Sequence, residues 1–156
     1  MIPQPLQPYL DIGAYLFPLP AGAKNPTGIV ANWRADATGD RSQIEQWATQ
    51  NPGCNWAMFA AASGLIVVDI DVKNVGRDAA WLAWCDTCAA WGMEPLQPAV
   101  STPSGGFHVY TRFGGGIDTA VLKQPALVKG VIDIRANGFV LIPPSVVDGK
   151  PYAAYS

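Results

Sequence analysis

At residues 64–73 the chain reads GLIVVDIDVK, a run rich in β-branched residues that ends in two aspartates. β-branched residues favour extended strands, in which successive side chains point to opposite faces of the sheet. Asp69 and Asp71 therefore share one face of the predicted strand, and Val68 and Ile70 occupy the other. Two carboxylates on one face of an otherwise apolar strand predict that a positively charged partner binds there.

Two further segments alternate in the same way between apolar and polar residues, FHVYTRF at 107–113 and GVIDIRA at 130–136. Their polar faces carry His108, Tyr110, Arg112, Asp133 and Arg135, and their apolar faces carry Phe107, Val109, Phe113, Ile132 and Ile134. If the three strands pair in one sheet, their polar faces converge on a single site. The fold is therefore predicted to gather several charged side chains around the first two aspartates.

Patterns elsewhere predict a mixed α+β fold with a largely antiparallel sheet. Further strands are expected at 14–20, 55–61 and 139–144, and helices at 40–52 and 76–91. Asp40 is the expected N-cap of the first helix. An Asn-Gly pair at 137–138 predicts a hairpin between the strands at 130–136 and 139–144. Three glycines at 114–116 predict a flexible link.

The composition is that of one folded domain without a membrane segment. The chain has 156 residues, of which 49% are hydrophobic and 14% are charged, a balance that excludes a disordered protein. No run approaches the ~18 consecutive apolar residues of a membrane span, and the N-terminus lacks the features of a signal peptide. A cytoplasmic protein is therefore expected. The net charge of −2 counts against a polynucleotide partner, since nucleic-acid-binding proteins are usually more basic.

The three cysteines are predicted to be core residues. Cys85 and Cys88 form the pattern CDTC within residues 78–93, where apolar residues recur at helical spacing. A zinc site needs further ligands, and only Cys54 and His108 remain to supply them. We therefore expect buried thiols and no structural zinc.

The aspartates suggest a different kind of metal site. Carboxylates on one sheet face provide the oxygen ligands that Mg²⁺ and Mn²⁺ prefer. Asp133 from a neighbouring strand could join Asp69 and Asp71 in a site for two ions, an arrangement suited to phosphoryl or nucleotidyl transfer. Solvated aspartates at a strand end are the alternative, because a D-x-D pattern alone is weak evidence.

His108 follows the loop STPSGG, residues 101–106. Glycines in such a loop can expose backbone N–H groups to a phosphate, so Ser104, Gly105 and Gly106 are candidate nucleotide-binding residues. This position favours a contact between His108 and a triphosphate over general base catalysis.

Two basic residues are candidates for further phosphate contacts. Lys24 lies among turn residues in AGAKNPTG (21–28), and Arg135 lies two residues after Asp133 on the same predicted strand. Each has a structural alternative, because Lys24 could be a solvated surface residue and Arg135 could form an ion pair with Asp133. Both alternatives stay open from the residues alone.

Several of these segments together resemble the bifunctional primase–polymerase domain of the archaeo-eukaryotic primase superfamily. The resemblance is carried by VVDIDVK (67–73), TPSGGFHVY (102–110) and GVIDIRANGFVLIPPS (130–145), preceded by YLFPLPAGAKNP (15–26) and NWRADATGDRSQIEQW (32–47). It covers about residues 12–152, and the order and spacing of the segments make it specific.

The resemblance implies an RNA-recognition-like sheet packed beside a small N-terminal α/β unit, with the active site between them. Residues 1–156 would form one catalytic domain, in which 1–11 are a loose arm, 12–54 the N-terminal unit and 55–156 the sheet with the catalytic acids. Asp69 and Asp71 match the D-x-D metal ligands and Asp133 the third acid. His108 matches the histidine that binds the incoming nucleotide, and Lys24 and Arg135 match basic positions near it.

The implied activity is template-directed nucleotidyl transfer, as primer synthesis, DNA polymerisation or both, with two Mg²⁺ or Mn²⁺ ions. The implied partners are a single-stranded DNA template, NTP or dNTP, and a helicase domain or protein. The setting would be replication of a plasmid, phage or other mobile element in a bacterial or archaeal cell. Two alternatives remain, a catalytically weak module that binds nucleotide or single-stranded DNA, and another D-x-D enzyme such as a glycosyltransferase.

Overall fold

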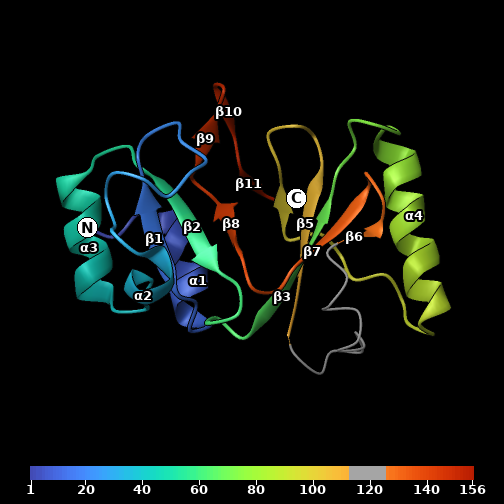
Figure 1. The fold of residues 1–156 in the computed structure, drawn as a ribbon, viewed down its shortest axis with the longest axis horizontal. Helices are drawn as coiled ribbons and strands as arrows, with labels where there is room; N and C mark the ends of the chain where they lie inside the picture. Colours follow the sequence, from blue (N-terminus) through green and yellow to red (C-terminus); the bar gives the residue numbers. More distant parts are fainter. Residues whose placement is uncertain (113–125) are drawn as a thin grey trace.

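The computed structural model describes residues 1–112 and 126–156. In this part of the chain, two larger antiparallel β-sheets lie side by side (Figure 1), and a third sheet has only two strands. The prediction of a mixed α+β fold with largely antiparallel sheets is confirmed. Leu65 and Val67 of the second sheet belong to the same core cluster as Met58 of the first, so a shared core joins the sheets. Phe113 and the glycines at 114–116 lie outside the described residues.

The first sheet is buried on both faces. Its strand order is β1-β2-β8, formed by Leu16–Leu19, Asn55–Phe59 and Phe139–Ile142. Trp56 and Met58 belong to the core cluster shared with the second sheet, whereas Ala57 between them belongs to a separate cluster. This double burial explains why the strands read as nearly continuous apolar runs rather than as alternating ones.

The second sheet carries the predicted site on its central strand. Its order is β11-β4-β5-β3-β7-β6, formed by Ala153–Ala154, Val100–Ser101, Phe107–Arg112, Leu65–Ile70, Ile132–Arg135 and Ala126–Val128. Helix α4 (Arg77–Ala90) lies against one face (Figure 1), where Trp84 and Cys88 are buried among alternate residues of β3, β5 and β7. Core packing is thus confirmed for Cys88 but not for Cys85, which is only partly buried, and Cys54 is buried in the shared core.

The predicted alternation along the three charged strands is confirmed. The residues of their apolar faces that join the α4 cluster are Ile66, Val68, Ile70, Phe107, Val109, Ile132 and Ile134. β3 pairs with β5 on one side and with β7 on the other, so all three polar faces lie on one side of one sheet.

The predicted hairpin between 130–136 and 139–144 is wrong in its pairing. Both strands form, but β7 pairs with β3 and β6, and β8 pairs with β2 in the first sheet. The physical reason is burial. β7 has one polar face and suits a half-exposed sheet, whereas β8 has apolar residues on both faces and suits the doubly buried one. β2 likewise belongs to the first sheet, although residues 55–156 were expected to form the sheet with the acids.

The expected loose arm at 1–11 is also wrong. Gln4–Leu6 form a 3₁₀ helix (η1) and Gln7–Asp11 form helix α1. Leu6 is fully buried in the shared core, together with Tyr9 and Leu10. The prolines do not prevent these helices, because they occupy first-turn positions, where a proline lacks no needed hydrogen bond.

Two further helices precede β2. The short helix α2 spans Trp33–Asp36, and α3 spans Arg41–Gln50. Asp40 caps α3 as predicted, since its carboxylate accepts a hydrogen bond from the Ser42 N–H at 3.0 Å. Among the described residues, no helix is long and apolar enough to cross a membrane.

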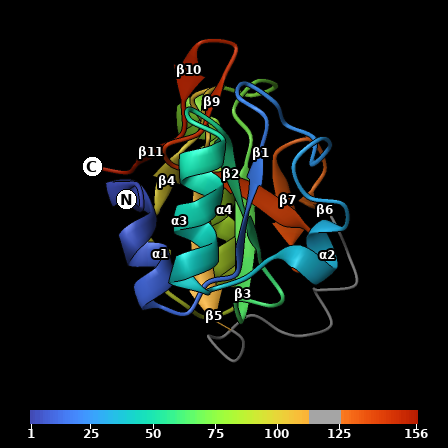
Figure 2. The ribbon, with the colours of Figure 1, turned by 90° about the vertical axis from the view of Figure 1, so that its left-hand side faces the viewer.

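A small hairpin near the C-terminus completes the fold. Its strands are β9 (Val146–Val147) and β10 (Lys150–Pro151), joined by Asp148 and Gly149. Both linking residues have positive φ, 51° and 74°, as a tight two-residue hairpin loop requires. The hairpin extends beyond the ends of the neighbouring strands in both views (Figures 1 and 2).

Candidate active site

The site is organised around Asp69, near the end of β3. In the strand register, His108 of β5 is its partner on one side and Asp133 of β7 its partner on the other. Residues paired across neighbouring strands point to the same face. The three polar side chains therefore form a row across the sheet, so the expected convergence of polar faces is observed.

The first part of β3 anchors this row in the core. On the face that carries Asp69, the preceding side chains Leu65 and Val67 are buried in the shared core. Asp69 and Asp71 keep 29% and 33% of their side chains exposed. β3 thus passes from the core between the sheets to a site that solvent reaches.

The environment of Asp69 disfavours a negative charge. Its pKa is raised from 3.8 to about 6, chiefly by burial and further by the charges of Asp133 and Asp71. Arg135 opposes this shift, and its Nε atom lies 4.0 Å from Oδ2 of Asp69. The local negative charge is therefore not fully compensated by the protein, which favours the binding of a cation.

Asp71 is held by contacts with Lys73 and Val131. Its Oδ1 atom accepts a hydrogen bond from the Lys73 N–H at 2.9 Å, and its Oδ2 atom lies 3.3 Å from the Lys73 ammonium. The Asp71 N–H donates to the carbonyl of Val131 at 2.8 Å, which continues the pairing of the β3 and β7 segments. The backbone position of Asp71 is thus fixed, while its carboxylate has an exposed and exchangeable partner.

His108 is buried, and its imidazole is neutral at pH 7. Burial lowers the pKa of His108 to about 4, with a further contribution from Arg135. Its Nε2 atom lies 3.7 Å from Oδ1 of Asp69, beyond hydrogen-bonding distance. Its Nδ1 atom is buried and has no hydrogen-bond partner among the described residues. Such an atom is costly to leave unsatisfied, so it indicates a site for a ligand.

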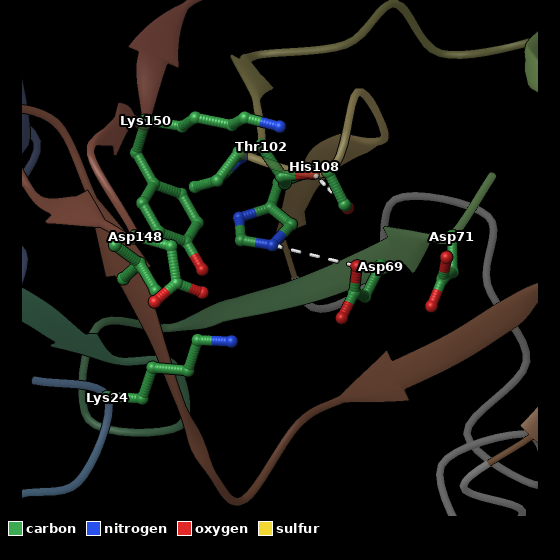
Figure 3. Close-up of a pocket in the computed structure, with 11 residues that line it drawn as sticks. Lys24, Asp69, Asp71, Thr102, His108, Asp148 and Lys150 are labelled. Atoms are coloured by element: carbon green, nitrogen blue, oxygen red, sulfur yellow. Dashed lines mark hydrogen bonds and ion pairs between the residues drawn. The ribbon is translucent and has the colours of Figure 1, made fainter. Parts of the chain in front are cut away.

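A pocket of about 450 Å³ opens beside the row (Figure 3). It is lined by Lys24, Asp69, Asp71, Thr102, Pro103, Ser104, His108, Val147, Asp148, Lys150 and Tyr152. A second pocket of about 340 Å³ adjoins it, shares Asp69 and His108, and adds Arg135 and residues of β8. Residues of both sheets line the second pocket, so this part of the site lies between them.

The loop before His108 is a tight turn. The Gly105 N–H donates to the Thr102 carbonyl at 2.9 Å, so this N–H is already used within the turn. A Cβ atom on Gly106 would lie 2.3 Å from the Ile70 carbonyl oxygen, so only glycine fits there. The two glycines therefore bring the loop close to the end of β3, and Ser104 is the residue of the three that lines the pocket.

A comparison with protein families matches residues 6–156 to the family described as "Bifunctional DNA primase/polymerase, N-terminal". The chain belongs to this family. Membership confirms the resemblance found in the sequence and implies DNA primase/polymerase activity in replication, with DNA and nucleotides as substrates. A comparison with curated proteins gave no significant match.

The site residues expected for a primase/polymerase domain largely meet at the two pockets. Lys24, Asp69, Asp71, Ser104 and His108 line the first, and Arg135 lines the second. Asp133, Gly105 and Gly106 line neither. Asp133 lies beside Asp69 on the side opposite to His108, so the row of acids extends away from the first pocket.

Six residues that line the first pocket of this primase/polymerase domain were not predicted from the sequence: Thr102, Pro103, Val147, Asp148, Lys150 and Tyr152. The Asp-Gly pair at 148–149 is a hairpin signal, and it could have located β9 and β10. It could not have shown that the hairpin covers the pocket, because that placement depends on contacts with β2, far away in the sequence.

The acids of this primase/polymerase domain fit divalent cations in their chemistry. Asp69, Asp71 and Asp133 offer carboxylate oxygens on one face, and the charges of Asp133 and Asp71 add to burial in raising the pKa of Asp69. In the described part of the chain, no three carboxylate, imidazole or thiolate groups lie close enough to hold one ion. The donor set is present without forming a closed cluster.

Proposed function

We propose that this domain carries out template-directed nucleotidyl transfer, with Asp69, Asp71 and Asp133 as ligands of divalent cations. The observation that carries the proposal is the register that places Asp69 between His108 and Asp133. Asp69 and Asp71 line the same pocket as two lysines and the hydroxyls of Thr102 and Ser104, and Asp133 lies beside Asp69 outside it. This is the charge distribution that a cation-bound nucleoside triphosphate needs.

Mg²⁺ or Mn²⁺ bound at these acids would supply Lewis-acid activation of the phosphoryl group. Asp69 and Asp133 offer carboxylates from paired strand positions. Asp71 can contribute its carboxylate when the exposed Lys73 ammonium moves away from Oδ2.

His108 holds the triphosphate rather than accepting a proton. With its pKa lowered to about 4, the imidazole is neutral at pH 7 and a weak base. It can donate one ring N–H to a phosphate oxygen from a buried, fixed position. Lys24 and Ser104 contact the phosphates from the pocket wall, and Arg135 balances charge next to Asp69.

The reaction is an in-line displacement at the α-phosphorus. The 3′-hydroxyl oxygen of a primer or of an initiating nucleotide forms the new P–O bond. The bond to the β-phosphate bridging oxygen breaks, pyrophosphate leaves, and the hydroxyl proton passes to solvent. The side chains contribute positioning and charge compensation, which dominate catalysis of phosphoryl transfer.

A second candidate function is binding without catalysis. It is favoured by one observation, that the carboxylate of Asp71 is paired with Lys73 and the three acids do not form a closed cluster among the described residues. Such a module would bind nucleotide or single-stranded DNA for a replication protein. The uncompensated charge at Asp69 argues against it, because a site that only binds anions has no use for buried acids.

The biological setting is a further part of the proposal. Family membership supports a role in DNA replication. We infer that the domain acts in the cytoplasm of a bacterial or archaeal cell on a plasmid, phage or other mobile element, together with a helicase domain or protein.

The test is incorporation of labelled nucleotides on single-stranded circular DNA with Mg²⁺ or Mn²⁺, with and without an annealed primer. Asp69→Ala should abolish product, and Asp86→Ala, which removes an exposed acid on α4, should retain it. Product from the Asp69→Ala variant would refute the assignment. Nucleotide binding without product on either template would support the binding module, and transfer of a sugar would support a different D-x-D enzyme.

A further inference from the structure

Lys24 and Lys150 line the same pocket from separate segments of the chain. Lys24 lies in the loop at 21–28, and Lys150 begins β10. Figure 3 shows their ammonium groups on opposite sides of the His108 ring. Within residues 1–112 and 126–156, neither lysine has a carboxylate oxygen within 4.0 Å. The pocket therefore contains two cations that the rest of the described chain does not neutralise.

Asn55 joins the two segments that carry these lysines. Its side chain is buried, with 2% of the residue exposed, and its amide donates hydrogen bonds to the carbonyls of Ala23 and Val146, each at 2.9 Å. Its oxygen accepts from the Val146 N–H at 2.9 Å. One residue of β2 thus holds the backbone next to Lys24 and the start of the hairpin that carries Lys150.

The remaining wall of the pocket suits phosphate groups. The hydroxyls of Thr102 and Ser104 lie 3.3 Å apart on the pocket wall, and both can donate hydrogen bonds to phosphate oxygens. Within residues 1–112 and 126–156, the buried Nδ1 atom of His108 has no hydrogen-bond partner. Asp148, two residues before Lys150, also lines the pocket, so its wall carries an acid besides Asp69 and Asp71. The two lysines can therefore bind an anion in this pocket, which Asp133 does not line.

We propose that Lys24 and Lys150 form a two-sided clamp on the β- and γ-phosphates of the incoming nucleoside triphosphate, and that Asn55 positions both lysines. The inference rests on the proposed function for the identity of the ligand. It adds two residues, Lys150 as a phosphate contact and Asn55 as a positioning residue. It also predicts a specificity, since the clamp distinguishes a triphosphate from a monophosphate.

The first experiment measures equilibrium binding of ATP, ADP and AMP by calorimetry, in EDTA and in Mg²⁺. Lys150→Ala should weaken ATP binding by about tenfold and leave AMP binding within about twofold, because AMP lacks the phosphates that the clamp holds. Lys150→Arg should retain most of the affinity. Lys129→Ala is the matched control, since it removes an exposed lysine at a turn outside the pocket.

The second experiment tests Asn55 through kinetics. Asn55→Ala should raise the KM for the nucleoside triphosphate about as much as Lys150→Ala does, because both lysines lose their position. The kcat should stay within about threefold of wild type, because the acids keep theirs. Asn55→Asp keeps the acceptor for the Val146 N–H and loses both donors, so it should be intermediate. If an Asn55 variant fails to fold, the exposed Lys150 variants still decide the matter.

The outcomes separate the clamp from the proposed catalysis. Equal losses for ATP and AMP, or a Lys150→Ala variant that matches Lys129→Ala, would overturn the clamp even if the domain makes product. ATP binding that depends on Lys150, in a protein that makes no product, would leave the clamp standing and overturn the proposed catalysis.

Discussion

Asp69 of β3 is paired directly with Asp133 of β7, so two carboxylates that both belong to the proposed metal site stand side by side on one sheet face. Like charges opposite one another destabilise a sheet, and Arg135, 4.0 Å from Oδ2 of Asp69, only partly offsets this effect at Asp69. Burial raises the pKa of Asp69 to about 6, and the Asp133 charge adds to this effect. In the metal-free protein, this arrangement lowers the free energy of unfolding, and it provides a site that can bind cations.

Asp69→Asn should therefore stabilise the metal-free fold while abolishing nucleotide incorporation. A pKa raised from 3.8 to about 6 means that the folded state binds the Asp69 proton more tightly than the unfolded state does. Stability of the wild type is therefore lost as pH rises from about 4 to about 6, and an asparagine has no such loss. The gain in free energy of unfolding should reach on the order of 1–3 kcal/mol above pH 7.

Urea denaturation in EDTA at several pH values measures this gain. The difference between the variant and the wild type should be largest above pH 7 and shrink as the pH is lowered through 6 toward 4. Asp86→Asn, on the exposed side of α4, is the control and should show no comparable trend. A variant less stable than wild type at pH 8 would contradict the electrostatic account of Asp69.

Asp133→Asn should reduce incorporation by at least about 100-fold, although Asp133 lines neither pocket. Its carboxylate is the neighbour of Asp69 on the sheet, so its loss removes a ligand and leaves the nucleotide pocket intact. ATP binding in EDTA should stay within about threefold of wild type, which separates loss of metal binding from loss of the pocket. Full activity in this variant would remove Asp133 from the site.

Gly106→Ala should destabilise the fold by about 2–4 kcal/mol, because a Cβ there would lie 2.3 Å from the Ile70 carbonyl oxygen, which is backbone. Gly138→Ala is the matched control, since a Cβ at that position has no atom within 4 Å. Thermal unfolding of both variants provides the comparison. Equal melting temperatures would mean that the loop before His108 can move away from β3 at little energetic expense.

The strand that carries the site was predictable, because alternation has a period of two and fixes which side chains share a face. That rule gave the face of Asp69, His108 and Asp133 within each strand, and their meeting on one sheet face depended on the pairing of the three strands, which the structure shows. The partner of β8 was not predictable from the Asn-Gly pair, since local turn chemistry does not show that both faces of a strand become buried. Only the full set of apolar contacts of Val140 and Leu141 decides the sheet to which β8 belongs.

The pocket wall formed by Thr102, Lys150 and Tyr152 could not be predicted from the sequence for a related reason. These residues come from a turn and a late hairpin, and their meeting depends on long-range hydrogen bonds. Asn55 makes two of these bonds to Val146, which lies 91 residues away in the chain. No periodic pattern in either segment records that contact. The family resemblance reaches about residue 152 and includes the segment 102–110, but it implied no role for Thr102, Lys150 or Tyr152.

Leu6→Ala should destabilise the domain by about 2–4 kcal/mol, because Leu6 is fully buried in the core shared by the two sheets. Ile12→Ala is the control, since Ile12 is 43% exposed and should change the free energy of unfolding by less than about 1 kcal/mol. Urea denaturation of both variants measures the difference. A small effect of Leu6→Ala would restore the interpretation of the N-terminal segment as a loose arm.

Lys73→Ala should increase the affinity of the domain for Mn²⁺ by about 2- to 5-fold. The Lys73 ammonium lies 3.3 Å from Oδ2 of Asp71 and competes with a cation for that carboxylate. The Lys73 side chain is 69% exposed, so the pair contributes only about 0.2–1 kcal/mol, and its removal sets the size of the gain. The hydrogen bond from the Lys73 N–H to Oδ1 remains in the variant and keeps Asp71 in place.

Mn²⁺ binding followed by electron paramagnetic resonance measures the affinity, with Lys129→Ala as the control for the change in net charge. An affinity equal to that of the control would mean that Asp71 is not a ligand or that Lys73 does not oppose it, and Asp71→Asn, which removes the ligand itself, would distinguish the two.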